Sequence, residues 1–251
     1  MKKVSNNHIK EDKMSKKRYK SSFIACAALL VLMVSVFGGF SCFQRPAQHD
    51  IPKLDNSKKH IACIGDSITY SYMSTDPLTK GYPAQLQNLV GDEYQVLNYG
   101  ICGATGRAFG DLPYIFQLHY IKSLLAKADI YIIMLGTNDS KPQNWDAAKY
   151  ERDYTNLIKS YKNLSNHPQV YILRPPVVYD EPGLETFDIR NDVIENEILP
   201  IVDRIGANLG VPVIDLNELT KNHLDWYADN VHPNDLGYEA IANQIYNNIQ
   251  W

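Results

Sequence analysis

Cysteine is scarce in this sequence, with four residues among 251. Two of them, Cys26 and Cys42, fall in the first 42 residues, which leaves Cys63 and Cys102 for the rest of the chain. No pair has the C-x-x-C spacing of zinc and thiol-redox sites. The sequence therefore excludes a disulfide-built miniprotein and predicts no metal site. We expect Cys63, which lies in an apolar run, to pack as a small core side chain, with a Cys63–Cys102 disulfide as the alternative.

Positive charge is also scarce beyond residue 42. Residues 1–20 carry eight Lys and Arg against two Asp and Glu, and residues 21–42 carry no charge. Residues 43–251 carry 17 Lys and Arg against 26 Asp and Glu, a net charge of −9. Such a body, with no basic stripe, lacks the electrostatic footprint of a nucleic-acid-binding protein, so we expect no nucleic-acid partner.

The first 42 residues have the layout of an export signal. A basic segment precedes an 18-residue apolar run, Phe23 to Phe40, in which Ser35 is the only polar side chain. At about 1.5 Å per residue, this run would reach about 27 Å as a helix, close to the minimum for crossing a bilayer core. The length is compatible with both a cleaved signal and a retained anchor.

The residues that follow this run resemble the lipobox of bacterial lipoproteins. Gly38 to Cys42 reads GGFSC, with a small residue before the cysteine, although Gly39 and Phe40 depart from the usual pattern. The resemblance implies that Cys42 becomes the lipidated N-terminus, and several acyl chains there would give stable membrane attachment. We therefore predict an exported, membrane-anchored bacterial lipoprotein, in the periplasm or at the cell surface. A retained anchor is the alternative.

Beyond residue 42 the sequence predicts a short tether and one α/β domain. Residues 43–59 contain two prolines and no apolar period, which indicates a tether, and residues 60–251 form the domain. In the domain, short apolar runs alternate with segments of 3- and 4-residue apolar spacing, as strands alternate with helices. This pattern predicts a single doubly wound five-stranded parallel sheet with helices on both faces. Pro200 should kink or restart the helix expected over 194–209. The strands are expected at Ile61–Ile64, Gln95–Asn98, Ile130–Leu135, Val170–Leu173 and Val213–Leu216.

Four polar segments follow predicted strands, at the sheet edge where open α/β folds bind ligands. The first contains Ser67, but Thr69 stands where the G-x-S-x-G motif of α/β-hydrolases requires its last glycine. No G-K-[ST] follows the glycines of the second segment, so it is not a phosphate-binding P-loop. The segments are Gly65–Ile68 (GDSI), Asn98–Gly106 (NYGICGATG), Gly136–Asp139 (GTND) and Asp229–His232 (DNVH).

Each segment by itself is compatible with an ordinary turn or helix cap. Together the four segments supply a nucleophile, a base with an orienting acid, and donors for an oxyanion. An aspartate three residues before a histidine can hold the imidazole tautomer that leaves Nε2 free as a base. Glycine N–H groups and an asparagine amide can stabilise an oxyanion, and a serine can serve as the nucleophile. The combination predicts acyl transfer through a covalent acyl-enzyme.

In this order, the four segments resemble the conserved blocks of the SGNH (GDSL-type) hydrolase family, over essentially the whole domain. The resemblance implies a flavodoxin-like sheet and a carboxylic ester hydrolase that needs no cofactor and no metal. It implies that Ser67 is the nucleophile and His232 the base, oriented by Asp229. The implied oxyanion donors are the backbone N–H groups of Ser67 and Gly103 and the side chain of Asn138.

The sequence departs from the family pattern at two positions. Ile68 stands where leucine is commoner, and Cys102 stands where serine is frequent, beside the oxyanion glycine. Gly100 lies close by, so the sequence leaves open whether Gly100 or Gly103 is the donor.

The domain resembles secreted bacterial esterases that remove acetyl groups from carbohydrates, including acetylxylan and sialic-acid esterases. We therefore expect an acylated small molecule or glycan as the substrate. Aromatic side chains near the sheet edge suit sugar rings, although packing is their commoner role; they are Tyr70, Tyr72, Tyr82 and Trp145. The alternatives are a lysophospholipase or thioesterase, an acyltransferase, and a non-catalytic carbohydrate-binding lipoprotein.

Overall fold

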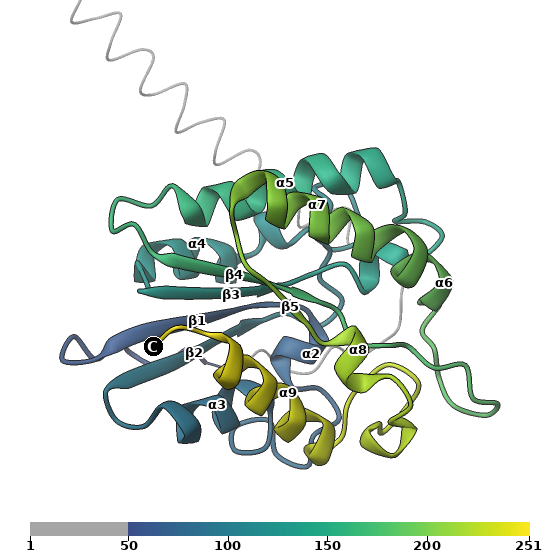
Figure 1. Ribbon diagram of the computed structural model, residues 1–251, viewed down its shortest axis with the longest axis horizontal. Coiled ribbons are helices and arrows are strands. Elements are labelled where there is room, and N and C mark those ends of the chain that lie inside the picture. The colour runs from purple at the N-terminus through teal and green to yellow at the C-terminus, as the bar shows by residue number, and fades with distance from the viewer. Residues whose placement is uncertain (1–49) are drawn as a thin grey trace, which may run out of the picture. The chain divides into compact units, whose positions relative to one another are not determined.

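The computed structural model describes residues 50–251, so the predictions for the leader and for Cys42 lie outside the described residues. Five parallel strands form one sheet in the order β2-β1-β3-β4-β5 (Figure 1). All five coincide with predicted runs, so the doubly wound, flavodoxin-like sheet is confirmed. The strands are β1 (Lys59–Gly65), β2 (Tyr94–Gly100), β3 (Ile130–Met134), β4 (Gln169–Arg174) and β5 (Val213–Asp215).

The register of the sheet brings the ends of the three central strands to one level. Gly65 of β1 pairs with Gly100 of β2 on one side and with Met134 of β3 on the other. The polar segments that follow these three strands therefore leave the sheet at the same edge. The strand order reverses between β1 and β3, which is where open α/β sheets form a crevice for ligands.

Helices cover both faces of the sheet (Figure 1). One face packs against α4 (Leu118–Ala126), α5 (Ala147–Lys162), α6 (Asn191–Val193) and α7 (Leu199–Leu209). The other packs against α3 (Tyr82–Val90) and α9 (Asp235–Asn248). Short helices α2 (Ser67–Tyr70) and α8 (Asn217–Thr220) follow β1 and β5. The 3-10 helices are η1 (Tyr114–Phe116), η2 (Asn138–Ser140) and η4 (Leu224–Trp226). In residues 50–251, no helix is long and apolar enough to cross a membrane.

The helix expected over 194–209 changes its hydrogen bonding just before Pro200. A π-helical segment, η3 (Ile194–Ile198), precedes α7, and Pro200 stands in the first turn of α7. Proline lacks an N–H donor and is tolerated in the first helical turn, where that donor has no partner within the helix. The expected restart at Pro200 is confirmed.

Tyrosines make up much of the core and tie helices to the edge of the sheet that carries the polar segments. Eight of the twelve largest fully buried side chains are tyrosines, so their hydroxyl groups need partners inside the protein. Tyr150 of α5 donates to the carbonyl oxygen of Leu135 at 2.9 Å. Tyr238 of α9 donates to that of Tyr72 at 2.6 Å. These bonds anchor the chain just after β3 and just after α2.

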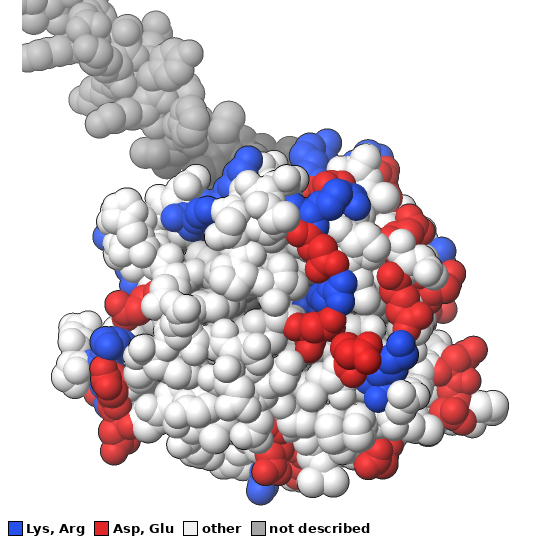
Figure 2. All heavy atoms as spheres, in the orientation of Figure 1, with Lys and Arg blue, Asp and Glu red and all other residues white. Residues whose placement is uncertain are grey.

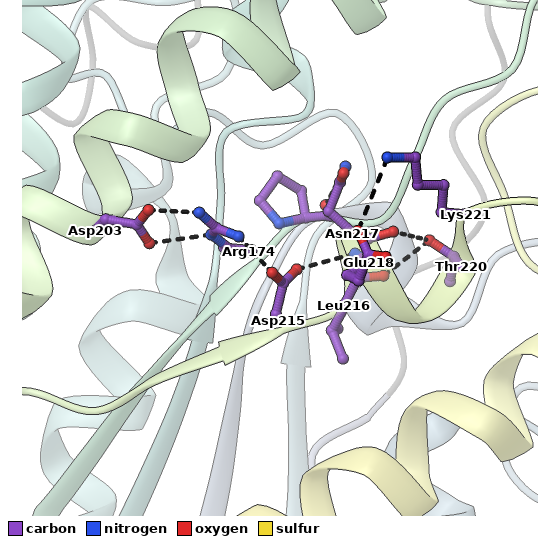
Figure 3. Close-up of polar contacts among 9 residues, drawn as sticks. Arg174, Asp203, Asp215, Leu216, Asn217, Glu218, Thr220 and Lys221 are labelled. Carbon is purple, nitrogen blue, oxygen red and sulfur yellow. Dashed lines mark hydrogen bonds and ion pairs between the residues drawn. The ribbon is translucent and has the colours of Figure 1, made fainter.

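The short edge strand β5 is held to its neighbours by an arginine (Figure 3). Arg174, at the end of β4, contacts Asp215 of β5 and Asp203 of α7. Oδ1 of Asp215 also accepts the Glu218 N–H at 3.0 Å and so fixes the start of α8. This network stabilises the sheet edge away from β1.

Residues 50–59, in the segment predicted as a tether, contact the domain. The Gln95 side chain accepts the Asp55 N–H and donates to the Lys53 carbonyl oxygen, at 2.9 and 3.0 Å. Ile51 and Leu54 pack against the core. Cys63 is buried in β1 as expected, and no disulfide joins Cys63 to Cys102.

The described surface carries charges of both signs. On the face seen in Figure 2, Lys and Arg side chains are interspersed with Asp and Glu and form no continuous basic band. On this face, the distribution gives no electrostatic support for nucleic-acid binding.

Candidate active site

Ser67 is the first residue of α2 and follows β1 after a one-residue turn. β1 ends at Gly65, where a Cβ atom would lie 2.6 Å from the Met134 carbonyl oxygen and 2.1 Å from Thr69 Oγ1. Only glycine fits that contact. Asp66 then caps α2, because its Oδ1 accepts the Ile68 N–H at 3.0 Å. The tight turn leaves Ser67 at the carboxyl edge of the sheet.

The structure brings Ser67, His232 and Asp229 together as a hydrogen-bonded chain. Ser67 Oγ lies 2.9 Å from His232 Nε2, although the two residues are 165 positions apart in the sequence. His232 Nδ1 lies 2.8 Å from Asp229 Oδ2. The three residues are 7%, 5% and 6% exposed, so water screens these contacts little.

The Asp229 carboxylate orients the imidazole from within its own loop. Its Oδ1 accepts the N–H groups of Val231 and His232 at 2.7 and 2.6 Å, while Oδ2 contacts the ring. Burial acts to raise the pKa of the Asp229 carboxyl, but the hydrogen bond and charge of His232 and the backbone donors outweigh it. The pKa is therefore lowered and the group stays ionised. An ionised partner at Nδ1 places the ring proton there and leaves Nε2 as an acceptor for the Ser67 hydroxyl.

Asn138 lies beside the loop that follows β2. Its Nδ2 donates to the Ala104 carbonyl oxygen at 3.2 Å, and the Asn144 side chain holds its backbone oxygen at 2.8 Å. An amide nitrogen carries two hydrogens, so the contact with Ala104 leaves one for another acceptor. Asn138 is 4% exposed and follows β3, as the sequence predicts.

Gly100 and Gly103, which the sequence could not separate, have different environments. The Gly100 N–H donates to Asn98 Oδ1 at 2.9 Å, and a Cβ atom at Gly100 would lie 2.1 Å from the Tyr70 backbone nitrogen. Gly100 therefore packs β2 against α2. Gly103 has φ 83°, in the left-handed region, and no hydrogen bond between described residues uses its N–H. Of the two glycines, only Gly103 offers a donor.

Asp139 joins the segment after β3 to the segment after β2. It is fully buried, and its two carboxylate oxygens accept the N–H groups of Gly106 and Arg107, each at 2.8 Å. Burial raises the pKa of Asp139 to about 6, against the opposing effect of these two donors. The sequence marks Asp139 only as part of the GTND segment. Its position directly after Asn138 was the available signal for a role in shaping the site.

The aromatic residues expected near the sheet edge lie in different surroundings. Tyr70 and Tyr82 are buried, and Trp145 packs against Tyr150 with ring centroids 5.6 Å apart. Tyr72 is the member of this set that contacts His232, with centroids 4.9 Å apart. Packing is thus the role of most of them.

A second aromatic residue, Phe187, contacts His232. The Phe187 ring lies 5.4 Å from the imidazole, measured between centroids. Phe187 stands in the loop between β4 and α6, which has no motif and no apolar period. No pattern in the sequence singles it out.

The arrangement contains the groups that acyl transfer uses. A buried serine contacts an imidazole nitrogen that can accept its proton, and the loops after β2 and β3 carry N–H groups of the kind that can bind an oxyanion. Among residues 50–251, no group of three or more His, Cys, Asp or Glu side chains is positioned to hold a metal ion.

Comparison with known proteins places these features in a family. The model of the GDSL-like Lipase/Acylhydrolase family matches residues 63–240. An acetylxylan esterase from Xylanibacter ruminicola is 32% identical over 213 residues, which are 78% of this chain and 44% of that protein. The chain thus spans less than half the length of this relative.

Solved structures share the fold at low sequence identity. The M. smegmatis aryl esterase superposes with a TM-score of 0.61 at 19% identity, over 75% of this chain and 97% of its own. A carbohydrate acetylesterase from Sinorhizobium meliloti superposes with a TM-score of 0.63 at 16% identity, over 76% of this chain and 97% of its own. A lipase/acylhydrolase from Enterococcus faecalis superposes with a TM-score of 0.58 at 24% identity, over 75% of this chain and 94% of its own.

Proposed function

The chain belongs to the GDSL-like lipase/acylhydrolase family, and we propose that it is a serine esterase that removes short acyl groups, above all O-acetyl groups, from carbohydrates. The observation that carries the proposal is the continuous, buried chain of hydrogen bonds from Ser67 through His232 to Asp229. The hydrogen-bond order matches what a serine nucleophile, its base and an orienting acid require.

In the proposed first step, Ser67 Oγ attacks the ester carbonyl carbon while His232 Nε2 takes the hydroxyl proton. The 2.9 Å contact between these two atoms allows that transfer without rearrangement. The Asp229 carboxylate stabilises the imidazolium that forms and does not itself take the proton. The tetrahedral intermediate then carries a negative charge on the former carbonyl oxygen.

Three donors would receive that oxygen: the N–H groups of Ser67 and Gly103 and the free Nδ2 hydrogen of Asn138. As the intermediate collapses, His232 returns the proton to the departing alcohol and leaves the acyl group on Ser67. Water, activated by His232, then hydrolyses the acyl-enzyme.

The substrate part of the proposal is supported by the relatives. The curated relative is named an acetylxylan esterase, and a structural neighbour is named a carbohydrate acetylesterase. The hydrogen-bonded geometry of Ser67, His232 and Asp229 favours an enzyme over a carbohydrate-binding scaffold without activity.

Acetate release from a panel of acetylated xylans, xylo-oligosaccharides and sialic acids tests the proposal, with Ser67→Ala as the inactive control. A ladder of p-nitrophenyl esters from acetate to palmitate separates the alternatives. We expect kcat/KM to be highest for acetate and to fall as the acyl chain lengthens. A maximum at long chains would instead indicate a lipase or lysophospholipase, and full activity of Ser67→Ala would rule out the acyl-enzyme.

We further propose that the protein is exported and lipidated on Cys42, with the domain attached to a membrane through residues 43–59. The support is the lipobox-like sequence after the apolar run. The mass of the N-terminal peptide from the membrane fraction tests this. A diacylglyceryl-modified Cys42 is expected, and an intact Met1 with unmodified Cys42 would show a retained anchor instead.

A further inference from the structure

Two aromatic rings contact the imidazole of His232 edge to face. Tyr72 meets it edge to face at 4.9 Å between centroids and 75° between planes, and Phe187 does so at 5.4 Å and 70°. Tyr72 follows α2, and Phe187 belongs to the loop between β4 and α6. Both side chains are half-buried, so each keeps part of its surface available for contact with a substrate.

Two hydrogen bonds hold the backbone of Tyr72, one at its N–H and one at its carbonyl oxygen. Its N–H donates to the Ser67 carbonyl oxygen at 2.9 Å, and its own carbonyl oxygen accepts the Tyr238 hydroxyl at 2.6 Å. The residues before and after it, Ser71 and Met73, have φ angles of 78° and 67°. This left-handed conformation is costly for residues with a Cβ atom.

The backbone at Phe187 has the same unusual conformation. Phe187 and the next residue, Asp188, have φ angles of 55° and 61°. Seven non-glycine residues in 50–251 have a positive φ, and four of them lie in these two segments. Strain of this kind persists where the surrounding structure enforces it, and it concentrates at functional sites.

Asn230 fastens the Phe187 loop to the loop that holds the base. It is fully buried; its Oδ1 accepts the Glu181 N–H at 3.0 Å, and its Nδ2 donates to the carbonyl oxygens of Glu181 and Leu184, each at 3.1 Å. Its own N–H donates to the Glu185 carbonyl oxygen at 3.3 Å. Since Asn230 lies two residues before His232, these bonds fix the Phe187 loop relative to the imidazole.

The reaction itself dictates what must lie near these rings. His232 Nε2 has to deliver a proton to the departing alcohol oxygen, which therefore comes within about 3 Å of that nitrogen. The carbon skeleton of the alcohol then comes close to the side chains that contact the imidazole. The acyl group, in contrast, is attached to Ser67 Oγ and need not touch these side chains.

We propose that Tyr72 and Phe187 form the two walls of the alcohol subsite and determine a preference for alcohols that are rings, such as pyranosides. The C–H faces of a sugar ring pack well against aromatic surfaces, whereas a short alkyl alcohol covers little of either. This inference rests on the proposed esterase function, since it concerns the leaving group of that reaction.

The test varies the alcohol while the acyl group stays acetyl. Wild type, Tyr72→Ala and Phe187→Ala are assayed on acetylated methyl xyloside and on ethyl acetate. We expect the ratio of kcat/KM for the sugar ester to that for ethyl acetate to fall about tenfold in each variant, as for other lost pocket contacts. The ratio between p-nitrophenyl acetate and p-nitrophenyl butyrate should stay the same, because these two esters differ only in the acyl group.

Two further variants separate recognition from folding. Phe187→Gly removes the ring and relieves the left-handed strain, so Tm should not fall while the sugar preference is still lost. Trp251→Ala removes an aromatic that packs on Tyr94, at the opposite end of β2 from the site, and should change neither ratio nor rate.

The outcomes are distinguishable. An unchanged ester ratio in Tyr72→Ala and Phe187→Ala, whether both rates fall together or neither does, would overturn the alcohol subsite. A wild-type protein that hydrolyses none of these esters would overturn the proposed function itself.

Discussion

The amide nitrogen of Asn138 donates to the carbonyl oxygen of Ala104 at 3.2 Å and so joins the loop after β3 to the loop after β2. Asp139 strengthens the same junction by accepting the N–H groups of Gly106 and Arg107. Two candidate oxyanion donors, on Asn138 and Gly103, are therefore set relative to each other by bonds between their loops.

Replacing Asn138 by alanine removes one proposed oxyanion donor. We expect kcat for p-nitrophenyl acetate to fall by ~10²–10³-fold with a much smaller change in KM, because the oxyanion exists only after attack. Steady-state kinetics measure both. Turnover near the wild-type value would exclude the side chain from the oxyanion site.

Replacing Asp139 tests the loop junction. Asp139→Ala leaves the N–H groups of Gly106 and Arg107 without an acceptor, at a cost of about 1–3 kcal/mol for a buried donor. We expect a lower free energy of unfolding by denaturant titration, together with reduced kcat. Asp139→Asn keeps one oxygen acceptor and should fall between alanine and wild type. Full activity of a destabilised Asp139→Ala would show that the junction does not position the donors.

The two glycines after β2 should respond differently to alanine. At Gly100 a Cβ atom would lie 2.1 Å from the Tyr70 backbone nitrogen, so Gly100→Ala should disrupt packing and lower Tm strongly. A Cβ atom at Gly103 would have its nearest neighbour 3.9 Å away, so alanine fits there. The remaining cost is that of the left-handed φ for a residue with a Cβ atom, about 1–2 kcal/mol. Gly103→Ala should therefore fold, and kcat should fall because relief of the left-handed φ would displace the N–H that the alanine retains. Equal thermal stability of the two variants, by circular dichroism melting, would contradict this distinction.

Asp66 should make the protein less stable as pH rises. Burial raises the pKa of its carboxyl to about 7, from an ordinary value of 3.8. Between these values the folded state holds a proton that the unfolded state has released, so the free energy of unfolding falls with rising pH, by at most about 1.4 kcal/mol per pH unit. Below a pH of 3.8 the Asp66 carboxyl is protonated in both the folded and the unfolded state. Above a pH of about 7 it is ionised in both states, and the folded state carries the full free-energy cost of burying the charge.

Asp66→Asn removes this titration and keeps an oxygen that can accept the Ile68 N–H. The variant should gain stability relative to wild type as pH rises from about 4 to 7, by an amount on the order of a few kcal/mol. Urea titrations at several pH values measure the difference. Parallel stability curves for the two proteins would show that Asp66 does not titrate in this range.

Much of the fold and the centre of the site follow from local sequence. Each strand contains a short apolar run that the sequence shows, and the carboxyl ends of neighbouring parallel strands lie at a common edge of the sheet. Residues that follow strands within a few positions, such as Ser67 and Asn138, are therefore expected at that edge, and a tight loop brings Asp229 to His232. No long-range contact had to be known to predict this grouping.

The tertiary structure decided what depends on contacts between distant segments. Gly103 rather than Gly100 offers an N–H because Gly100 packs against α2 and bonds to Asn98. Phe187 reaches His232 through bonds that Asn230 makes to a loop without a motif. Strand periodicity and strand-end motifs are properties of neighbouring residues, whereas side-chain neighbours across loops depend on how the whole chain packs. The sequence by itself therefore determined the sheet and the grouping of Ser67, His232 and Asp229, and only the packed structure decided which glycine offers an N–H and which aromatic rings contact the imidazole.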